Sequence, residues 1–583
     1  MGLSLPGPAP VPAFDRHFFT GRERFTAIGR GSLGGKAQGL ARMHHLVEGT
    51  LTASFQPDIE VCVPTLTVIT TEFFDLFMKQ NDLADVALSD HRDDVIANAF
   101  QKADLPAQLV GDLRALIAQV QTPLAVRSSS LLEDAIFEPF ASVYATKMIP
   151  NNQLDTDSRF RKLVEAVKFI YASTFFKDAK NYIGATRHAT ADEKMAVIIQ
   201  EVVGLMHGQR FYPDVSGVAR SHNFYPLGHA KPSDGVINLA LGLGKTIVDD
   251  GVAWSYSPVH PQANPPYNTL DDLLSQTQSE FWAISMESPA EYNPIKETEY
   301  LRKYSLQEAE KDGVLRFLAS TYRAQDDKIV YGIAEPGPRV IDFAPILKFD
   351  LLPLNRLLRH LLKLCEDALE RMVEIEFAMT LDERRGKPSR FGFLQVRPMV
   401  VSAAEVELRP DDLGGNDVLV ASEAALGNGV REDIRDVVYV RPDKFNVHHS
   451  EAVAVELDGL NRQLQALGRP YLLIGFGRWG TSDPQAGIPV NFGQISGAKV
   501  IVESALPETS SMLSQGSHFF HNITSFRVFY FSLSPFDKYR IDWEWLNRQP
   551  AAGEAEFVRH VRLASPLKIM VDGTTSRGVI RHG

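Results

Sequence analysis

Hydrophobic and polar positions near residue 390 follow the two-residue period of a β-strand. In the stretch 391–399, FGFLQVRPM, Leu394 and Val396 share one face, and Gln395 and Arg397 share the other. An amide and a guanidinium that are buried together need polar partners, because an unpaired buried polar group costs free energy. The pattern therefore predicts a buried strand whose polar face meets a ligand or a charged neighbour.

The residues before this strand predict a helix and a second strand. The stretch 351–372 repeats leucine at helical spacing and is the clearest amphipathic helix of the chain. It leads into the strand-like stretch 373–381, VEIEFAMTL, and polar residues 382–390 then connect to the strand at 391–399. Two strands joined by a polar loop are predicted to pair as a hairpin.

Short apolar runs and amphipathic stretches alternate along the rest of the chain, which predicts an α/β (α+β) fold class. No internal repeat is present. The other expected strands lie within 61–69, 122–134, 195–204, 216–221, 236–251, 469–477, 498–506 and 523–535, and the other expected helices within 29–47, 70–80 and 451–468.

The length of the chain, 583 residues, predicts two to four compact domains. Residues 1–19 begin with a Pro- and Ala-rich stretch, which predicts a flexible tail. The region 403–435 is dense in glycine, aspartate and other charged residues, as linkers are. Residues 436–583 are then expected to form a smaller α/β domain.

Composition and charge narrow the class of protein. The net charge of -12 argues against nucleic acid as a partner, because phosphate backbones attract basic surfaces. The two cysteines, Cys62 and Cys365, lie in apolar contexts, which is typical of a reduced, cytoplasmic protein without disulfides. No apolar run has the length of a membrane span, so no membrane partner is expected. The oligomeric state stays open, a homo-oligomer included.

The predicted hairpin carries candidate chemistry on one face. Glu374 and Glu376 share a face of the first strand, as Gln395 and Arg397 do on the second. If the faces coincide, Glu376 and Gln395 offer the oxygen ligands that Mg²⁺ prefers, and Arg397 offers a planar fork of donors to phosphate. A surface salt bridge between Glu376 and Arg397 would explain the same residues without a ligand.

Three other segments have features of phosphate sites. Lys36 lies in the glycine-rich stretch LGGKAQGL before a helix, where backbone N–H groups and a lysine favour anions. It is not a Walker A loop, because alanine follows the lysine, and an ordinary glycine turn is the alternative. Arg127 follows an apolar strand and precedes three serines, which could instead be a capping cluster. Gly242, Gly244 and Lys245 give only a weak P-loop signal.

Eight motifs follow one another between residues 20 and 400: GGKAQGL, VPTLTVITTEFF, LAVRSSSLLEDAIFEPFAS, MAVIIQEVV, SGVARS, LGLGKTIVDDGV, EIEF and LQVRP. In this order they resemble the nucleotide-binding domain of the phosphoenolpyruvate synthase and pyruvate phosphate dikinase family. The resemblance implies an ATP-grasp-like fold, with a first lobe at 20–190 and a second lobe at 191–402 that holds the hairpin. It also implies that ATP cleavage drives phosphoryl transfer, with AMP as a product.

The resemblance assigns roles to individual residues. Lys36 and Arg127 would hold the triphosphate, and Arg397 would stabilise the transferring phosphoryl group, which makes these three the expected catalytic residues. Glu376 and Gln395 would bind magnesium. The residues expected to bind ATP are Lys36, Arg127, Gln200, Glu201, Val203, Gly242, Gly244 and Lys245.

The sequence departs from the family's pattern in two ways. The segment that carries the phosphoaccepting histidine in full-length members is absent, and the residues after 435 are too few for a pyruvate-binding barrel of about 250 residues. Pyruvate is therefore not the expected acceptor. In the nucleotide domain itself, Arg220 and His222 replace small or apolar residues, and Lys245 stands where an acid is common.

The C-terminal residues offer candidates for an acceptor site. Arg478, Trp479 and Asp483 follow an expected strand in a glycine-rich loop, a typical place for a ligand in an α/β sheet. A tryptophan that packs over a structural turn is the alternative. His518 could replace the missing phosphoacceptor, although such histidines are more often structural.

The preferred hypothesis is an ATP- and Mg²⁺-dependent phosphotransferase with an unknown acceptor, a metabolite or a protein. The missing relay histidine motivates two alternatives. One is an ATP-binding sensor or scaffold with little turnover. The other is the ATP-cleaving component of a split phosphotransfer system.

Overall fold

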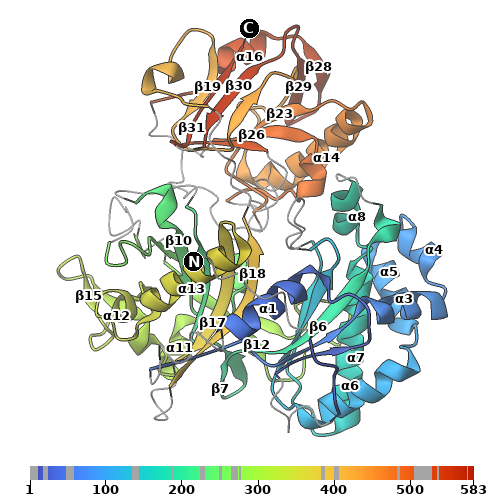
Figure 1. The fold of residues 1–583 in the computed structure, drawn as a ribbon. Helices are drawn as coiled ribbons and strands as arrows, with labels where there is room; N and C mark the ends of the chain where they lie inside the picture. Colours follow the sequence, from blue (N-terminus) through green and yellow to red (C-terminus); the bar gives the residue numbers. More distant parts are fainter. Residues whose placement is uncertain are drawn as a thin grey trace, which may run out of the picture.

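The computed structural model of the protein arranges the chain as two neighbouring lobes with a C-terminal unit beside them (Figure 1). The two lobes are built by the first 400 residues, and the C-terminal unit by the residues after them. The structure describes residues 11–16, 24–47, 55, 58–133, 143–184, 189–223, 230–248, 252–263, 273–274, 277–289, 291–381, 388–399, 406–481, 486–504, 528–534, 538–573 and 575–582.

The first lobe is a five-stranded sheet with most of its helices packed on one face. Residues Leu109, Leu113 and Leu116 of one of these helices recur at helical spacing and are all buried, which is why that stretch folds as a helix against the sheet. The sheet order is β1 (Phe25–Ile28), β3 (Leu66–Ile69), β6 (Met195–Glu201), β4 (Leu124–Ser130) and β5 (Thr146–Ile149). The helices of this lobe are α1 (Gly34–Leu46), α3 (Thr71–Gln80), α4 (Ala84–Leu88), α5 (Asp93–Lys102), α6 (Ala107–Gln119), α7 (Thr156–Ser173) and α8 (Lys177–Gly184).

Strand β6 is buried on both faces, and this explains its uninterrupted apolar sequence. Val197 and Ile199 pack into the cluster formed with the helices of the first lobe. Ala196 and Ile198 point the other way and join the cluster that contains the core of the second lobe. The first sheet therefore has most of its helices on one face, while its other face packs on α1 and on the second lobe.

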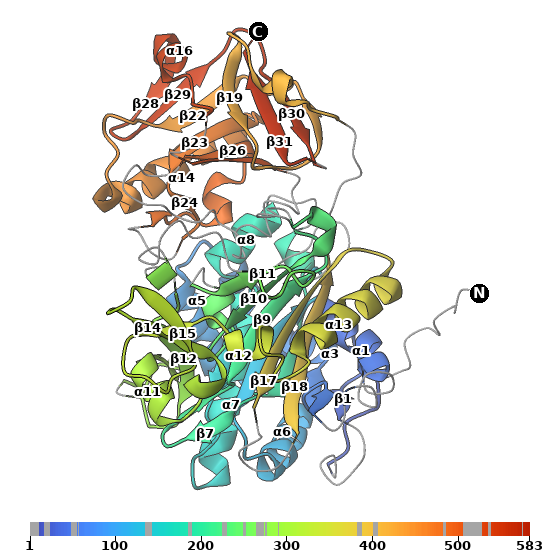
Figure 2. The ribbon, with the colours of Figure 1, turned by 90° about the vertical axis from the view of Figure 1, so that its left-hand side faces the viewer.

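The second lobe is built on a six-stranded sheet, and Figure 2 shows its central strands side by side with α13 (Leu354–Leu369) lying over them. Leu357, Leu361 and Cys365 are among the buried residues of α13, so the predicted amphipathic helix is confirmed. The predicted hairpin is confirmed too. The sheet order is β11 (Trp254–Tyr256), β10 (Val236–Ala240), β9 (Val215–Arg220), β17 (Val373–Thr380), β18 (Ser389–Pro398) and β2 (Ile59–Cys62).

Two smaller sheets complete the second lobe. One has the order β13 (Leu301–Ser305), β12 (Glu280–Ser285), β8 (Arg210–Tyr212) and β7 (Leu205–His207), and the other the order β15 (Lys328–Tyr331), β14 (Ala319–Arg323) and β16 (Arg339–Ile341). The short helices among them are α9 (Lys245–Val248), α11 (Leu306–Lys311) and α12 (Ala344–Leu347).

The two sheets do not divide the chain at residue 190, where the sequence places the boundary between lobes. Strand β2 precedes that position but pairs with β18 in the second lobe. Strand β6 follows it but pairs with β3 and β4 in the first lobe. The period of a strand marks its buried faces and not its partners, so sequence order alone could not show this exchange.

The C-terminal unit contains a seven-stranded mixed sheet in which β22, β23, β26 and β27 run parallel. Helix α14 (Ser450–Ala466), which the sequence predicts, connects the first two of these parallel strands, although the sequence did not predict β22. The sheet order is β20 (Ala425–Leu426), β27 (Phe529–Leu533), β26 (Ala498–Ser504), β23 (Tyr471–Phe476), β22 (Asp436–Val440), β29 (Val558–Arg562) and β28 (Ala551–Glu554). The unit also has helix α16 (Trp543–Arg548) and the strand pair β24 (Arg478–Trp479) and β25 (Gly487–Ile488).

The prediction of a linker at 403–435 is wrong for most of this range, because three strands lie within it. They pair with β31 (Arg577–Arg581), β27 and β30 (Lys568–Asp572) of the C-terminal unit. Leu408 and Leu413, which precede them, are buried in an apolar cluster with Ala421 and Val579. The glycine and aspartate residues form a surface turn within the unit and do not separate domains. The second sheet of the unit has the order β19 (Val418–Ser422), β31, β30 and β21 (Gly429–Arg431).

The C-terminal unit contacts the first lobe near α8. The side-chain amide of Asn491 donates a hydrogen bond to Asp178 Oδ1 at 2.8 Å. A Cβ on Gly493 would lie 2.7 Å from the Cβ of Asn181, so the backbone there approaches α8 closely. Across the residues that the structure describes, no helix has both the length and the apolar character of a bilayer span.

Trp479 is a core residue of the C-terminal unit. Its side chain is fully buried, and its indole Nε1 donates to the carbonyl oxygen of Val502 at 3.3 Å. A Cβ on Gly475 would lie 2.4 Å from the Trp479 ring, so that strand needs glycine to make room for it. Trp479 therefore packs in the core, which is the alternative that the sequence left open. Its side chain is not exposed to an acceptor.

We predict that Trp479→Ala destabilises the protein. Removing a fully buried indole leaves a cavity and lowers the free energy of unfolding by about 3–5 kcal/mol. Urea denaturation followed by circular dichroism measures this change. Val455→Ala, at a side chain of α14 that is 70% exposed, is the control and should change it by less than about 0.5 kcal/mol. Equal effects of the two substitutions would contradict the assignment of Trp479 to the core.

Candidate functional site

The polar face of the hairpin is formed by matching positions on three neighbouring strands. Glu374 on β17 lies opposite Arg397 on β18 and opposite Arg220 on β9. Glu376 lies opposite Gln395 on β18. Because alternate residues of a strand share a face, both rows project from the same side of the sheet. The other side carries Ile375, Phe377 and Val396, which join the apolar cluster that contains α13.

The first row of this polar face is a buried ion-pair ladder. Arg397 Nε donates to Glu374 Oε1 at 2.7 Å, and Arg397 Nη2 contacts the same oxygen. Arg220 Nε donates to Glu374 Oε2 from the other side. All three side chains are buried, so these charge-assisted hydrogen bonds replace the water that each group loses. The closest carboxylate to Arg397 is Glu374, while Glu376 lies 4.0 Å away.

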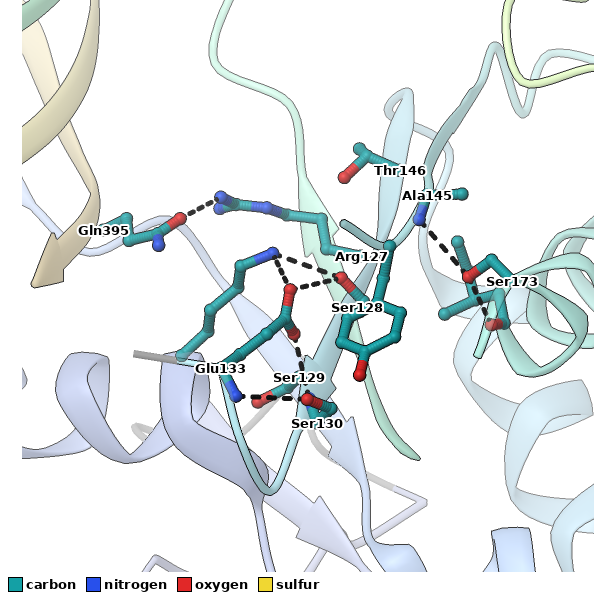
Figure 3. Close-up of polar contacts among 12 residues, drawn as sticks. Arg127, Ser128, Ser129, Ser130, Glu133, Ala145, Thr146, Ser173 and Gln395 are labelled. Atoms are coloured by element: carbon teal, nitrogen blue, oxygen red, sulfur yellow. Dashed lines mark hydrogen bonds and ion pairs between the residues drawn. The ribbon is translucent and has the colours of Figure 1, made fainter. Parts of the chain in front are cut away.

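Arg127 links the first sheet to the second row of the polar face. From β4, its Nη2 donates to Gln395 Oε1 at 2.8 Å, and Figure 3 shows the two side chains pointing toward each other. Its Nη1 donates to the carbonyl oxygen of Leu394 at 3.0 Å, and its Nη2 lies 3.7 Å from Glu376 Oε2. The structure thus brings Arg127 together with Glu376 and Gln395, which follow it by 249 and 268 residues in the sequence.

Lys36 lies in a buried polar group at the end of β4. Its Nζ is 2.7 Å from Glu133 Oε1 and 3.1 Å from Ser128 Oγ. Ser128 Oγ also donates to Glu133 Oε1 at 3.0 Å, and the backbone N–H of Ser130 donates to Glu133 Oε2 at 2.9 Å (Figure 3). The N-terminus of α1 approaches this strand so closely that a Cβ on Gly34, whose φ is +73°, would lie 1.7 Å from the Ser129 carbonyl oxygen. Glycine at this position therefore brings Lys36 to the serines.

A second buried carboxylate supports the same group. Glu193 accepts a hydrogen bond from the Tyr144 hydroxyl at 2.9 Å and one from the backbone N–H of Leu131 at 3.1 Å. Burial raises the pKa of Glu193 to about 7, because desolvation penalises the charged form. Burial, together with the nearby Glu193 and Glu133, also raises the pKa of Tyr144. The serine end of β4 is thus held by hydrogen bonds on both sides.

Of Gln200, Glu201 and Val203, which the resemblance assigns to ATP binding, only Gln200 lies beside Arg127. Gln200 is buried, and its Oε1 accepts from Arg127 Nη1 at 3.3 Å. Its buried Nε2 has no hydrogen-bond partner among the described residues. Glu201 alternates to the other face and accepts from Thr122 Oγ1 at 2.9 Å. Val203 is buried, and a Cβ on Gly392 would lie 2.5 Å from its Cγ2.

The glycine turn after β10 lies on the same side of the second sheet as Glu376. Its helix α9 places Ile247 in a small apolar cluster with Val218, the β9 residue opposite Glu376. Gly242 has a φ of +83°, and a Cβ there would lie 2.6 Å from the Trp282 carbonyl oxygen, so the turn requires glycine. A Cβ on Gly244 would lie 3.8 Å from the Ser216 Cβ. Lys245 Nζ lies 5.8 Å from the centre of the Trp282 ring.

The two carboxylates of the hairpin differ in their capacity to bind a cation. Both oxygens of Glu374 accept from guanidinium groups. The oxygens of Glu376 lie 3.7 and 4.0 Å from the nearest guanidinium nitrogens, and the side chain is 19% exposed. Glu376 therefore suits a hard cation, with Gln395 beside it. No group of three or more acidic, histidine or cysteine side chains that could hold a metal ion occurs in the described part of the chain. Mg²⁺ needs only one or two protein ligands when phosphates supply the others.

Only some of the residues expected to bind the acceptor lie in the described part of the chain. Arg478 is half-buried on the short strand β24 beside the core residue Trp479. Asp483 and His518 lie outside the residues that the structure describes.

Sequence reasoning gave no role to three residues of this region. Glu133 holds Lys36, and its signal was a carboxylate three residues after the serine cluster. Glu374 was seen to share a face with Glu376, but only the pairing of three strands shows that it holds Arg397. Arg220 stood out as an unusual residue, and its partner Glu374 is 154 residues away.

Comparison with known proteins identifies the family of the chain. A search of the curated proteins finds no match. The model of one protein family, described as the AMP/ATP-binding domain of pyruvate phosphate dikinase, matches residues 30–413. The match covers well over half of the chain. It includes the first sheet apart from β1, the six-stranded sheet of the second lobe, the Lys36 group, Arg127 and the hairpin. The protein therefore belongs to the family of the pyruvate phosphate dikinase AMP/ATP-binding domain.

Proposed function

We propose that this protein is an ATP- and Mg²⁺-dependent phosphotransferase whose two lobes, ATP-grasp-like in arrangement, hold ATP at the contact between β4 and the β17–β18 hairpin. The observation that carries the proposal is the meeting of Arg127 with Gln395 and Glu376 across the two sheets. The family, whose domain comes from enzymes that use ATP for phosphoryl transfer, supports the same site.

The side chains at this contact suit a polyphosphate. Phosphoryl transfer depends mainly on positioning and on neutralising negative charge, and buried cations do this more strongly than exposed ones. Arg127 would bind phosphate oxygens through its guanidinium by exchanging its hydrogen bonds to Gln395 at 2.8 Å and to the Leu394 carbonyl oxygen at 3.0 Å for the ligand. Its contact with Glu376 is already long, at 3.7 Å. Lys36 and Arg397 would supply further positive charge on either side. Magnesium, when bound, would neutralise part of the phosphate charge and would be held by Glu376 and Gln395.

The Nε2 of Gln200, which has no hydrogen-bond partner within the described part of the chain, adds independent support for a ligand. A buried donor without an acceptor costs free energy, and an oxygen or nitrogen atom of a bound nucleotide would remove that cost. The base itself is proposed to bind along the end of β6, where Gln200, Glu201 and Val203 follow one another.

The acceptor is proposed to be a compound other than pyruvate, bound by the C-terminal unit. Its parallel strands β22, β23, β26 and β27 have their carboxyl ends at one edge, which is the usual place for a ligand in such a sheet. Arg478 follows the carboxyl end of β23 and is the described residue most suited to an anionic acceptor.

Phosphorus NMR of the protein with ATP, Mg²⁺ and a metabolite extract tests this function. We expect the ATP signals to be lost and those of AMP or ADP to appear together with one newly phosphorylated compound. ATP that binds but stays intact would contradict the phosphotransferase and favour a sensor or scaffold. Turnover that appears only when a second polypeptide is added would favour the split system instead.

We predict that Arg127→Met weakens ATP binding in the presence of Mg²⁺. Hydrogen bonds from a charged group are worth about 1.5–3 kcal/mol, which corresponds to a rise in Kd of about 10- to 150-fold. Isothermal titration calorimetry measures the Kd. The matched control is Arg302→Met, which removes an arginine that is 41% exposed and pairs with Glu287 at 3.2 Å. An unchanged Kd for Arg127→Met would remove this arginine from the site.

We also predict that Glu376→Gln raises the Mg²⁺ concentration needed for half-maximal ATP binding by at least about tenfold. The substitution keeps the shape of the side chain but removes a unit charge, and at short range that attraction exceeds about 1.4 kcal/mol. A Mg²⁺ titration at fixed ATP concentration gives the value. Glu287→Gln, at an exposed carboxylate, should leave it unchanged. A response of Glu376→Gln equal to that of the control would exclude Glu376 as a ligand.

A further inference from the structure

We propose that Arg220 keeps Glu374 from binding metal, so that the nucleotide site holds a single divalent cation and Glu374 acts as a positioning residue for Arg397. The inference rests on the proposed function, because it concerns the cation that accompanies ATP at the hairpin. It depends on a contrast between two carboxylates that are two residues apart and share one face of β17.

Both oxygens of the first carboxylate, Glu374, accept hydrogen bonds from guanidinium groups. Glu374 is 1% exposed, and the register of the sheet places it between Arg220 on β9 and Arg397 on β18. One oxygen accepts from Arg220 Nε, and the other accepts from Arg397 at 2.7 Å. Arg220 and Arg397 are themselves 9% and 5% exposed. A cation that took an oxygen of Glu374 would have to displace a buried guanidinium from its hydrogen-bonded carboxylate, which costs free energy.

The second carboxylate, Glu376, lies beyond hydrogen-bond distance of the neighbouring guanidinium groups. Glu376 occupies the next row, where β9 contributes the apolar Val218 and β18 contributes Gln395. Its oxygens lie 3.7 Å from Arg127 and 4.0 Å from Arg397, beyond hydrogen-bond distance, and its side chain is 19% exposed. Arginine in one row and valine in the other thus separate the roles of two glutamates with the same chemistry.

The ladder fixes the orientation of two guanidinium groups. Arg220 and Arg397 both pair with the one carboxylate of Glu374, and the Nε group of each arginine donates to it. A polyphosphate at the hairpin would then meet one cation at Glu376 and the guanidinium of Arg397, which Glu374 holds in place.

The number of Mn²⁺ ions bound together with a non-hydrolysable ATP analogue tests the inference. Mn²⁺ is the probe because electron paramagnetic resonance counts free and bound ions directly. We expect one Mn²⁺ per protein in the native chain and two in Arg220→Met, in which one oxygen of Glu374 is released. Arg220→Lys, which keeps the charge, and the exposed control Arg302→Met should each bind one ion.

Each other outcome overturns the inference. Two ions in the native chain would contradict a site that holds a single cation, and this count needs no variant to fold. One ion in a folded Arg220→Met protein, checked by circular dichroism, would show that Arg220 is not what excludes the second cation. Failure of the proposed function is distinguishable, because the native chain would then bind neither the analogue nor analogue-dependent Mn²⁺.

A variant of Glu374 tests whether this residue positions Arg397 or only stabilises the fold. We expect Glu374→Gln to lower kcat for ATP cleavage by at least tenfold while the count stays at one Mn²⁺, because Arg397 loses its anchor but Glu376 keeps its ion. A Mn²⁺ count that falls to zero in a folded Glu374→Gln protein would instead make Glu374 the metal ligand.

Discussion

The contact between Arg127 and the β17–β18 hairpin is the interaction on which the architecture of the site depends. A guanidinium that leaves water must find acceptors, and Arg127 finds them on the other sheet, at Gln395 and at the Leu394 carbonyl group. The two sheets are therefore joined by polar groups at this place, while apolar side chains join them elsewhere. A charged ligand can replace a polar contact between two layers, but it cannot replace an apolar one. The nucleotide site is proposed at this contact for that reason.

Burial sorts the charged residues around this contact by their partners. Lys36 is paired with Glu133, and Arg397 is paired with Glu374, so both cations are held in place by carboxylates that the solvent does not reach. Glu376, by contrast, lies 3.7 Å or more from the guanidinium groups and is partly exposed to solvent. Such pairing gives little net stability, because desolvation offsets the attraction. Its consequence is a fixed geometry for groups that phosphoryl transfer requires in fixed positions.

The sequence predicted the faces of the elements better than their partners. The alternation at 373–381 and 391–399 and the leucine spacing at 351–372 identified the hairpin and its covering helix, because each signal is local. The exchange of β2 and β6 between the sheets, and the strands inside the expected linker, depend on pairing between distant segments, which no local period records. For the same reason Glu133 and Arg220 were not recognised as partners of Lys36 and Glu374. Trp479 was ambiguous, since a tryptophan after a strand suits a ligand loop and a core equally.

The central claim is that Glu376, Gln395 and Arg127 converge on a magnesium-bound polyphosphate. Anomalous diffraction from crystals grown with Mn²⁺ and a non-hydrolysable ATP analogue tests it most directly. The account predicts an anomalous peak bonded to the Glu376 carboxylate, with phosphate oxygens on both the metal and the Arg127 guanidinium. A nucleotide bound elsewhere in the chain, or a metal peak away from the hairpin with Arg127 still on Gln395, would contradict it.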